Sequence, residues 1–143
     1  GSEMCIRDSM GAVVAKKEVA DVFKPGDHGS TFGGSCLAIA ACAATLSALV
    51  RGDYAEHAAK VGAYMEQALA KLPHVVEVRG RGLMLGCDLD DAAGDAHDIV
   101  ARALAAGVVI NATGAHTLRF LPPLVCEEAD VDSLVEILSG VLG

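Results

Sequence analysis

The fold of this chain is decided by the stretch Gly26-Asp27-His28-Gly29-Ser30-Thr31-Phe32-Gly33-Gly34, a glycine-rich loop that runs straight into an apolar helix. Glycine lets backbone N–H groups approach a ligand closely and adopt positive φ. The hydroxyls of Ser30 and Thr31, together with the positive end of the following helix, would attract an anion. Such a loop can hold a phosphate, but an ordinary tight connection has the same composition. Both interpretations stay open on the loop alone.

The segments on either side of the loop extend this pattern. Ser35 is a good N-cap for a helix at 37–50, which is apolar on nearly every face and is therefore expected to be buried all round. Its small residues would let another helix or another subunit come very close. Upstream, the apolar run at 10–15 predicts the end of a buried strand, and 18–23 predicts a short helical turn that ends at Pro25-Gly26.

A second helix is predicted directly after Arg51-Gly52. Asp53 with Glu56 three residues later is typical of a capping box, and Pro73 closes the segment. Apolar residues at steps of three and four indicate one buried face. These residues are Tyr54, Ala58, Val61, Met65, Ala68, Leu69 and Leu72.

The remainder of the chain predicts a compact α+β unit of order ββαββα. Gly80-Arg81-Gly82 is typical of a hairpin turn, Gly107 ends a helix, and Pro122-Pro123 prevents the last strand from continuing. The expected elements are strands at 75–79 and 83–89, a helix at 95–106, strands at 108–111 and 117–121, and a helix at 127–142.

The composition of the chain indicates which kinds of partner it is not built to bind. The 143 residues are 52% hydrophobic and carry a net charge of −8, which argues against a nucleic-acid partner. The apolar run at 35–50 is too short to span a membrane. Five cysteines without a CxxC pair or metal-ligand spacing indicate free thiols in a reducing compartment, and we expect a cytoplasmic protein without a metal site.

Arg119 is the second candidate site residue. It stands between Leu118 and Phe120 in a predicted strand, and burying a guanidinium is costly unless it faces a partner or a cleft. Its planar fork suits a carboxylate. An arginine on an edge strand that faces water explains the pattern equally well. His57 and His97 are expected on exposed helix faces, and no spacing identifies a nucleophile.

The first nine residues, 1–9, differ from everything that follows. They lack any periodicity, and we interpret them as a non-native tail that takes no part in the fold. The fold interpretation therefore begins at residue 10.

Three segments in register carry a family resemblance: GDHGSTFGG at 26–34, VRGRGLMLGCDL at 78–89 and GVVINATGAHTLRFLPPL at 107–124. Together they resemble the C-terminal part of the class III pyridoxal-phosphate-dependent aminotransferases. The sequences of these segments are most similar to those of the acetylornithine and succinylornithine aminotransferases within that family. The resemblance extends over 10–143.

The resemblance implies a fold and three site residues. The fold would be the C-terminal part of a fold-type I transferase, α/β and α+β, with 10–52 ending the large cofactor-binding domain and 53–143 forming a linking helix and a small domain. Ser30 and Thr31 would contact the phosphate of pyridoxal 5′-phosphate bound to the other subunit of a homodimer. Arg119 would bind the α-carboxylate of the substrate.

The resemblance also implies a reaction, in which an amino group passes from N-acetylornithine, or a related ω-amino acid, to 2-oxoglutarate in arginine biosynthesis. The family's Schiff-base lysine precedes the segment that matches 10–15, and the tail at 1–9 contains no lysine. We therefore expect the chain to be a fragment that is inactive by itself. Ser35-Cys36 also stands where the family usually has Asn-Pro. The proline whose fixed φ favours the first helical position is therefore absent.

Two other classes of protein compete with this interpretation. A free-standing α+β module that binds a ligand or partner without catalysis would explain 53–143, but it would leave the apolar helix at 37–50 uncovered. A nucleotide-binding phosphate loop requires GxxxxGK[ST], which the sequence lacks.

Overall fold

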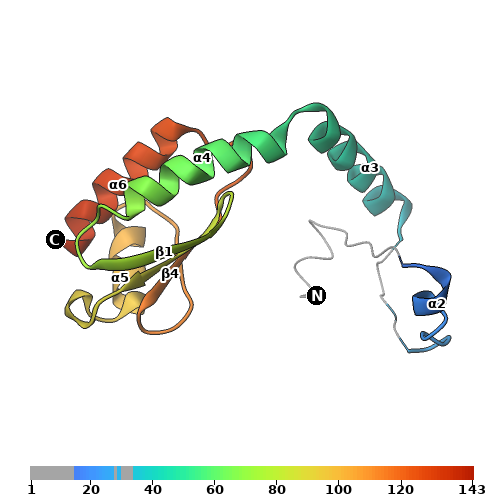
Figure 1. Ribbon diagram of the computed structural model, residues 1–143, viewed down its shortest axis with the longest axis horizontal. Helices are drawn as coiled ribbons and strands as arrows, with labels where there is room; N and C mark the ends of the chain where they lie inside the picture. The colour runs from blue at the N-terminus through green and yellow to red at the C-terminus, as the bar shows by residue number, and fades with distance from the viewer. Residues whose placement is uncertain (1–14, 28, 30–33) are drawn as a thin grey trace. The chain divides into compact units, whose positions relative to one another are not determined.

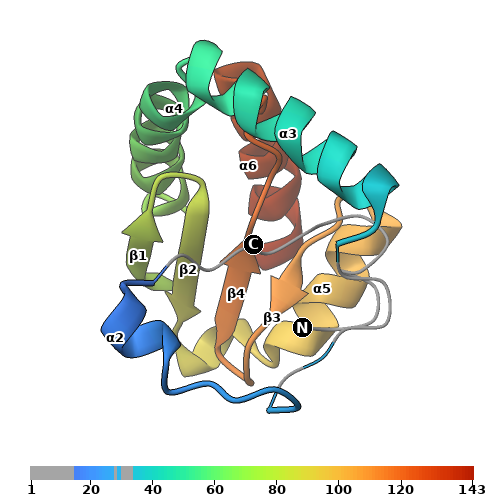
Figure 2. The ribbon, with the colours of Figure 1, turned by 90° about the vertical axis from the view of Figure 1, so that its right-hand side faces the viewer.

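The computed structural model describes residues 15–27, 29 and 34–143, and the chain divides into two compact units, Gly1–Gly52 and Asp53–Gly143. Figure 1 and Figure 2 together label the helices α2 to α6 and the strands β1 to β4. The tail at 1–9 and nearly all of the strand predicted at 10–15 lie outside the described residues.

The first unit contains helices α2 (Lys17–Ala20) and α3 (Cys36–Arg51). α2 is shorter than predicted, and Pro25-Gly26 follows it in a tight turn. The Asp27 N–H donates to the Lys24 carbonyl at 3.1 Å, and Gly26 has φ +100°, which is the geometry of a type II turn. α3 begins as predicted, because the Ser35 hydroxyl accepts a hydrogen bond from the Ala38 N–H.

The prediction that the apolar helix at 37–50 is buried on all sides is wrong for the described structure. No residue of α3 is buried, and Leu37 and Val50 are each 82% exposed. The reason is that a helix of this composition needs cover that the described residues do not supply. α3 therefore presents a large apolar surface, which soluble monomers rarely expose.

The second unit begins with α4 (Tyr54–Leu69), whose buried face follows the predicted periodicity. The predicted capping box is absent, because Asp53 adopts the left-handed conformation at φ 48° and its carboxylate accepts no cap hydrogen bond. Aspartate tolerates this conformation better than most residues. The remaining elements are β1 (Val75–Arg81), β2 (Met84–Leu89), the short 3₁₀ helix η1 (Asp91–Ala93), α5 (Ala96–Ala105), β3 (Asn111–Ala112), β4 (Thr117–Phe120) and α6 (Glu128–Leu142).

The strands form one antiparallel sheet in the order β1-β2-β4-β3, which Figure 2 shows side by side. The ββαββα order is confirmed, but two boundaries differ from prediction. Gly80 and Arg81 belong to β1, and the hairpin turns at Gly82-Leu83 instead. β3 is shorter than the predicted strand at 108–111 and shares only Asn111 with it. The Val108 N–H donates to the Ala103 carbonyl and so closes α5 rather than joining the sheet.

The core lies between the sheet and the helices α4, α5 and α6. Alternate residues of the strands point into it, among them Leu85 and Cys87 of β2 and Leu118 and Phe120 of β4. Because strand side chains alternate between faces, the residues between these ones lie on the opposite face. No helix of the second unit covers that face, and it holds most of the polar side chains of the sheet.

No single described helix has both the length and the apolar composition that a membrane crossing needs, and only the bent pair α3 and α4 taken together meets those two criteria. Within the same residues, no three His, Cys, Asp or Glu side chains gather in a way that could hold a metal ion.

Candidate functional site

A single row of residues crosses the open face of the sheet. Arg79 on β1 pairs with Gly86 on β2, Gly86 pairs with Arg119 on β4, and Arg119 pairs with Asn111 on β3. Neighbouring strands lie about 4.8 Å apart, so the two arginines begin roughly 10 Å from each other. β4 is an inner strand, and the interpretation of Arg119 as an edge-strand residue is therefore wrong.

Asp88 neutralises the first of these arginines. Its carboxylate accepts hydrogen bonds from an Nη atom of Arg79 and, at 2.6 Å, from the Thr117 hydroxyl. These contacts, the Thr117 bond first, lower the pKa of Asp88 below its usual range. The same carboxylate raises the pKa of Arg79. Asp88 thus ties β1, β2 and β4 together on the open face.

Arg119 has a different environment. Its neighbours Leu118 and Phe120 are buried, which leaves the Arg119 side chain exposed on the open face. Among the described residues, no acidic side chain lies within ion-pair distance of its guanidinium. Arg119 is therefore available to an anion from outside the chain.

Gly86 keeps space open between the two arginines. A Cβ at this position would have as its nearest neighbour the Arg79 carbonyl oxygen at 3.8 Å, which is an ordinary contact. The backbone does not require glycine here, since Gly86 does not have positive φ. Gly86 therefore places no side chain between Arg79 and Arg119, and the side-chain atoms nearest to its missing Cβ are Arg79 Cγ at 3.9 Å and Thr117 Cγ2 at 4.0 Å.

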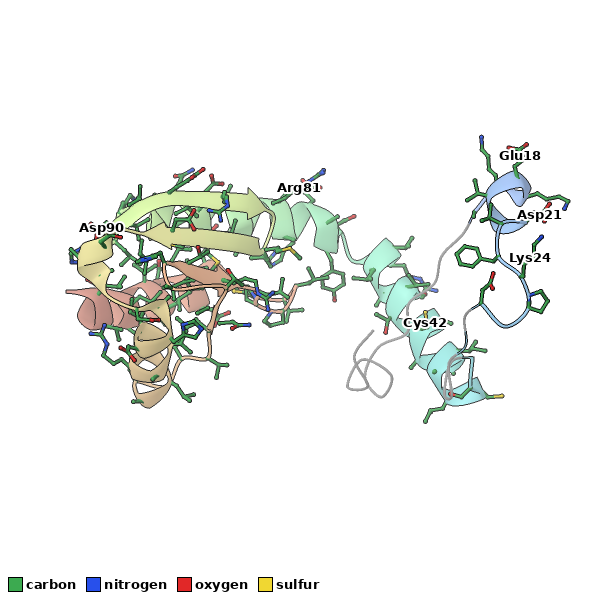
Figure 3. All side chains as sticks on the ribbon, turned by 90° about the horizontal axis from the view of Figure 1, so that it is seen from below. Glu18, Asp21, Lys24, Cys42, Arg81 and Asp90 are labelled. Atoms are coloured by element: carbon green, nitrogen blue, oxygen red, sulfur yellow. The ribbon has the colours of Figure 1, made fainter. Side chains whose placement is uncertain are left out.

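The remaining charged side chains mark the two ends of the sheet. Arg81 lies at the hairpin end of β1, and Asp90 lies at the opposite end (Figure 3). Asp90 accepts from the N–H groups of Ala92 and Ala93 and contacts His74 Nδ1 at 3.0 Å. These interactions cap η1 and play no part in the row around Arg119.

The glycine-rich loop is described only at its margins. His28, Ser30 and Thr31 lie outside the described residues. At the margins, Gly26 and Gly34 have positive φ, and a Cβ at either position would meet no atom of the described residues within 4 Å. Gly34 leads through Ser35 into the N-terminus of α3, so the positive end of that helix lies at the end of the loop.

Two further features lie away from Arg119. His57 is half-buried rather than exposed, because its Nε2 contacts the Cys126 carbonyl oxygen at 2.9 Å; His97 is exposed, as predicted. Burial raises the pKa of the Cys87 thiol to about 11, which makes it a poor nucleophile.

An apolar hollow of about 640 Å³ opens beside α6, with Val109, Ile110, Leu121, Val125, Val131 and Leu134 among its lining residues. Arg119 is not among those residues, since its side chain lies on the other face of the sheet. This hollow could not be predicted from the sequence, because its walls come from segments that lie far apart in it.

The comparisons with known proteins agree with the resemblance of the three motifs. Residues 9–142 match the family model for aminotransferase class-III. The acetylornithine aminotransferase of Caldanaerobacter subterraneus is 44% identical over 137 residues, which are 93% of this chain and 34% of that protein. This chain spans about a third of the length of the curated relatives that it matches.

Solved structures show the same relationship. The ornithine delta-aminotransferase of Plasmodium falciparum matches 90% of this chain and 35% of its own, with a TM-score of 0.78 and 32% identity. The ornithine aminotransferase of Toxoplasma gondii, described with partial occupancy of PLP at its active site, matches 87% of this chain and 30% of its own, with a TM-score of 0.73 and 34% identity. The predicted fold class is confirmed, and the chain belongs to the class-III aminotransferase family.

Proposed function

We propose that this chain contributes the substrate-carboxylate site and part of the cofactor-phosphate site of a pyridoxal-phosphate-dependent aminotransferase. One observation carries the proposal: Arg119 is an exposed guanidinium on an inner strand, with no acidic partner among the described residues and with Gly86, which has no side chain, opposite it on β2. A guanidinium in this setting can bind a carboxylate through two parallel hydrogen bonds. Every amino acid and 2-oxo acid substrate carries such a group.

The margins of the glycine-rich loop fit a phosphate. Among the described residues, no atom lies within 4 Å of where a Cβ would stand at Gly26, Gly29 or Gly34, so the backbone can approach a ligand there. Ser30 and Thr31 add two hydroxyl donors, and the N-terminus of α3 follows. When bound, pyridoxal phosphate supplies the electron sink for amino-group transfer. The role of Ser30 and Thr31 is to hold the phosphate end, and that of Arg119 is to orient the substrate.

The uncovered apolar surface of α3 supports a homodimer. Leu37 and Val50 of α3 are each 82% exposed, and contact of their apolar surface with water is unfavourable. A second subunit that packed on α3 would remove this surface from water. In such a dimer we assign residues 10–52 to the large domain, residues 53–143 to a linking helix and the small domain, and Ser30 and Thr31 to the phosphate of the partner's site. Free cysteines at 36, 42, 87 and 126 agree with a reducing cytoplasm.

For the substrates we propose N-acetylornithine, or a related ω-amino acid, as the donor and 2-oxoglutarate as the acceptor, in arginine biosynthesis. The support is the 44% identity to an acetylornithine aminotransferase, although an ornithine aminotransferase of Bordetella pertussis is also 42% identical over 92% of the chain. The 143-residue chain alone is expected to show no turnover, because no lysine stands ahead of the segment at 10–15.

A chimaera tests this function. Residues 10–143 would replace the matching third of the Caldanaerobacter acetylornithine aminotransferase, which keeps its own remaining residues. We expect the chimaera to bind pyridoxal phosphate and to transfer the amino group of acetylornithine faster than that of ornithine or 4-aminobutyrate. A chimaera that binds the cofactor but turns over none of the three donors would contradict the proposed function.

Mixing two inactive chimaeras tests whether the loop acts across the dimer. One carries Ser30→Ala with Thr31→Ala, and the other lacks the catalytic lysine of the Caldanaerobacter part. If the loop serves the partner's site, each heterodimer contains one complete site and activity returns on mixing. If the loop serves its own subunit, no heterodimer has a complete site and the mixture stays inactive.

A further inference from the structure

Two guanidiniums share one row on the open face, and only one of them has an acidic partner. Arg79 pairs with Asp88, whereas Arg119, two strands away, has no acidic partner among the described residues. The Asp88 side chain is 29% exposed, so its pair with Arg79 lies partly shielded from water. The Thr117 hydroxyl holds the same carboxylate from the strand that carries Arg119.

An unpaired Arg79 would compete with Arg119 for the same anion. Arg79 and Arg119 lie on the same face with only Gly86 between them on β2, so a carboxylate that enters from the open side can reach either guanidinium. Binding at Arg79 would place the substrate roughly 10 Å from its position at Arg119, a displacement that amino-group transfer could not tolerate. An acidic residue beside Arg79 removes this alternative, which is how a binding site rejects a wrong pose.

We infer that Asp88 is a specificity-determining residue: it occupies Arg79 and thereby directs substrate carboxylates to Arg119. The inference rests on the proposed function, because it concerns the same carboxylate site. Asp88 acts through Arg79 and touches no substrate itself. Its bond to Thr117 keeps the carboxylate turned toward Arg79 rather than toward the guanidinium of Arg119.

The reactivity of the individual arginines tests this inference in the 143-residue chain. Phenylglyoxal adds to the neutral guanidine, so an ion pair that stabilises the protonated form slows the reaction. Peptide mapping by mass spectrometry gives a rate for each arginine. In the unmodified sequence we expect Arg119 to react faster than Arg79, and an excess of 2-oxoglutarate to slow Arg119 only, against potassium chloride at equal ionic strength.

The decisive variant is Asp88→Asn, whose amide oxygen still accepts from Thr117 while the charge is lost. We expect the rate at Arg79 to rise about two- to fivefold, the effect of losing one exposed ion pair. We also expect 2-oxoglutarate now to protect Arg79 as well as Arg119. Asp88→Glu should restore the slow rate, and Asp88→Ser provides a second variant without the charge.

Glu77→Gln is the matched control, because Glu77 lies opposite Asp88 on the same face and the change in net charge is the same. The rate at Arg79 should rise less in this variant than in D88N, because Asp88 raises the pKa of Arg79 more than the charge of Glu77 does. An unchanged Arg79 in D88N and D88S, or an equal rise in E77Q, would overturn the role of Asp88 while leaving the proposed function intact. Failure of 2-oxoglutarate to protect Arg119 in the unmodified sequence would instead contradict the proposed function itself.

Discussion

Arg119 on β4 stands directly opposite Gly86 on β2, so the one arginine of the row without an acidic partner among the described residues also has no side chain beside it on that strand. We therefore expect a substitution at Gly86 to change carboxylate binding at Arg119 while the fold stays intact. The strand geometry at Gly86 accepts a side chain, and such a side chain would stand between those of Arg79 and Arg119.

Gly86→Val should therefore separate binding from stability. A valine suits the strand, and the free energy of unfolding should change by no more than about 1 kcal/mol. Its methyl groups would stand beside Arg119, and in the chimaera we expect the KM for 2-oxoglutarate to rise by about tenfold. The KM of the Gly86→Ala variant should lie between that of the unmodified chimaera and that of G86V. An unchanged KM in G86V would show that the carboxylate does not bind next to Gly86.

A second prediction concerns the contact between α4 and the β1–β2 turn. A Cβ at Gly62 would clash with the Gly82 carbonyl oxygen, whereas a Cβ at Gly140 in α6 would meet no atom of the described residues within 4 Å. Gly62→Ala should lower the free energy of unfolding by about 3 kcal/mol, because the helix must move away from the turn. Gly140→Ala should raise it by up to about 1 kcal/mol through helix propensity. Urea unfolding of the two variants measures both changes in the free energy of unfolding. Equal changes would refute the close approach of Gly62 in α4 to the β1–β2 turn.

The third prediction concerns pH. Because the folded-state pKa of Asp88 is lowered by Thr117 and Arg79, its contribution to stability is present above the unfolded pKa of about 3.9 and is lost as pH falls through the folded value. The urea midpoints of the unmodified chain and of D88N should differ at neutral pH. That difference should shrink below about pH 4. A difference that is constant down to pH 2 would show that the charge of Asp88 does not stabilise the fold.

Much of the second unit could be predicted from the sequence, because its signals are local. The apolar spacing of α4, the proline pair after β4 and the glycine after α5 each fix an element through the backbone around it. The predictions failed where a contact distant in the sequence decides the conformation. The hairpin turn lies at Gly82-Leu83 because Gly80 and Arg81 pair with β2. Val108 is not part of β3 because its N–H donates to the Ala103 carbonyl at the end of α5.

The candidate site shows the same division. Arg119 could be singled out from its apolar neighbours in the sequence, and the strand alternation explains why it is exposed. The contributions of Asp88, Thr117 and Gly86 could not be predicted. They depend on the register of three strands, and a shift of one residue would place each side chain on the other face.

The most direct measurement of the central claim compares Arg119→Lys with Arg81→Lys in the chimaera. Both residues are exposed arginines of the same sheet, and lysine keeps the charge while losing the two-pronged geometry that binds a carboxylate. We predict that R119K lowers kcat/KM for both acetylornithine and 2-oxoglutarate by at least about tenfold, the value of a lost charge-assisted hydrogen bond, while R81K leaves it unchanged. The same kcat/KM in R119K as in R81K, with pyridoxal phosphate bound to both, would contradict the assignment of Arg119 as the carboxylate-binding residue.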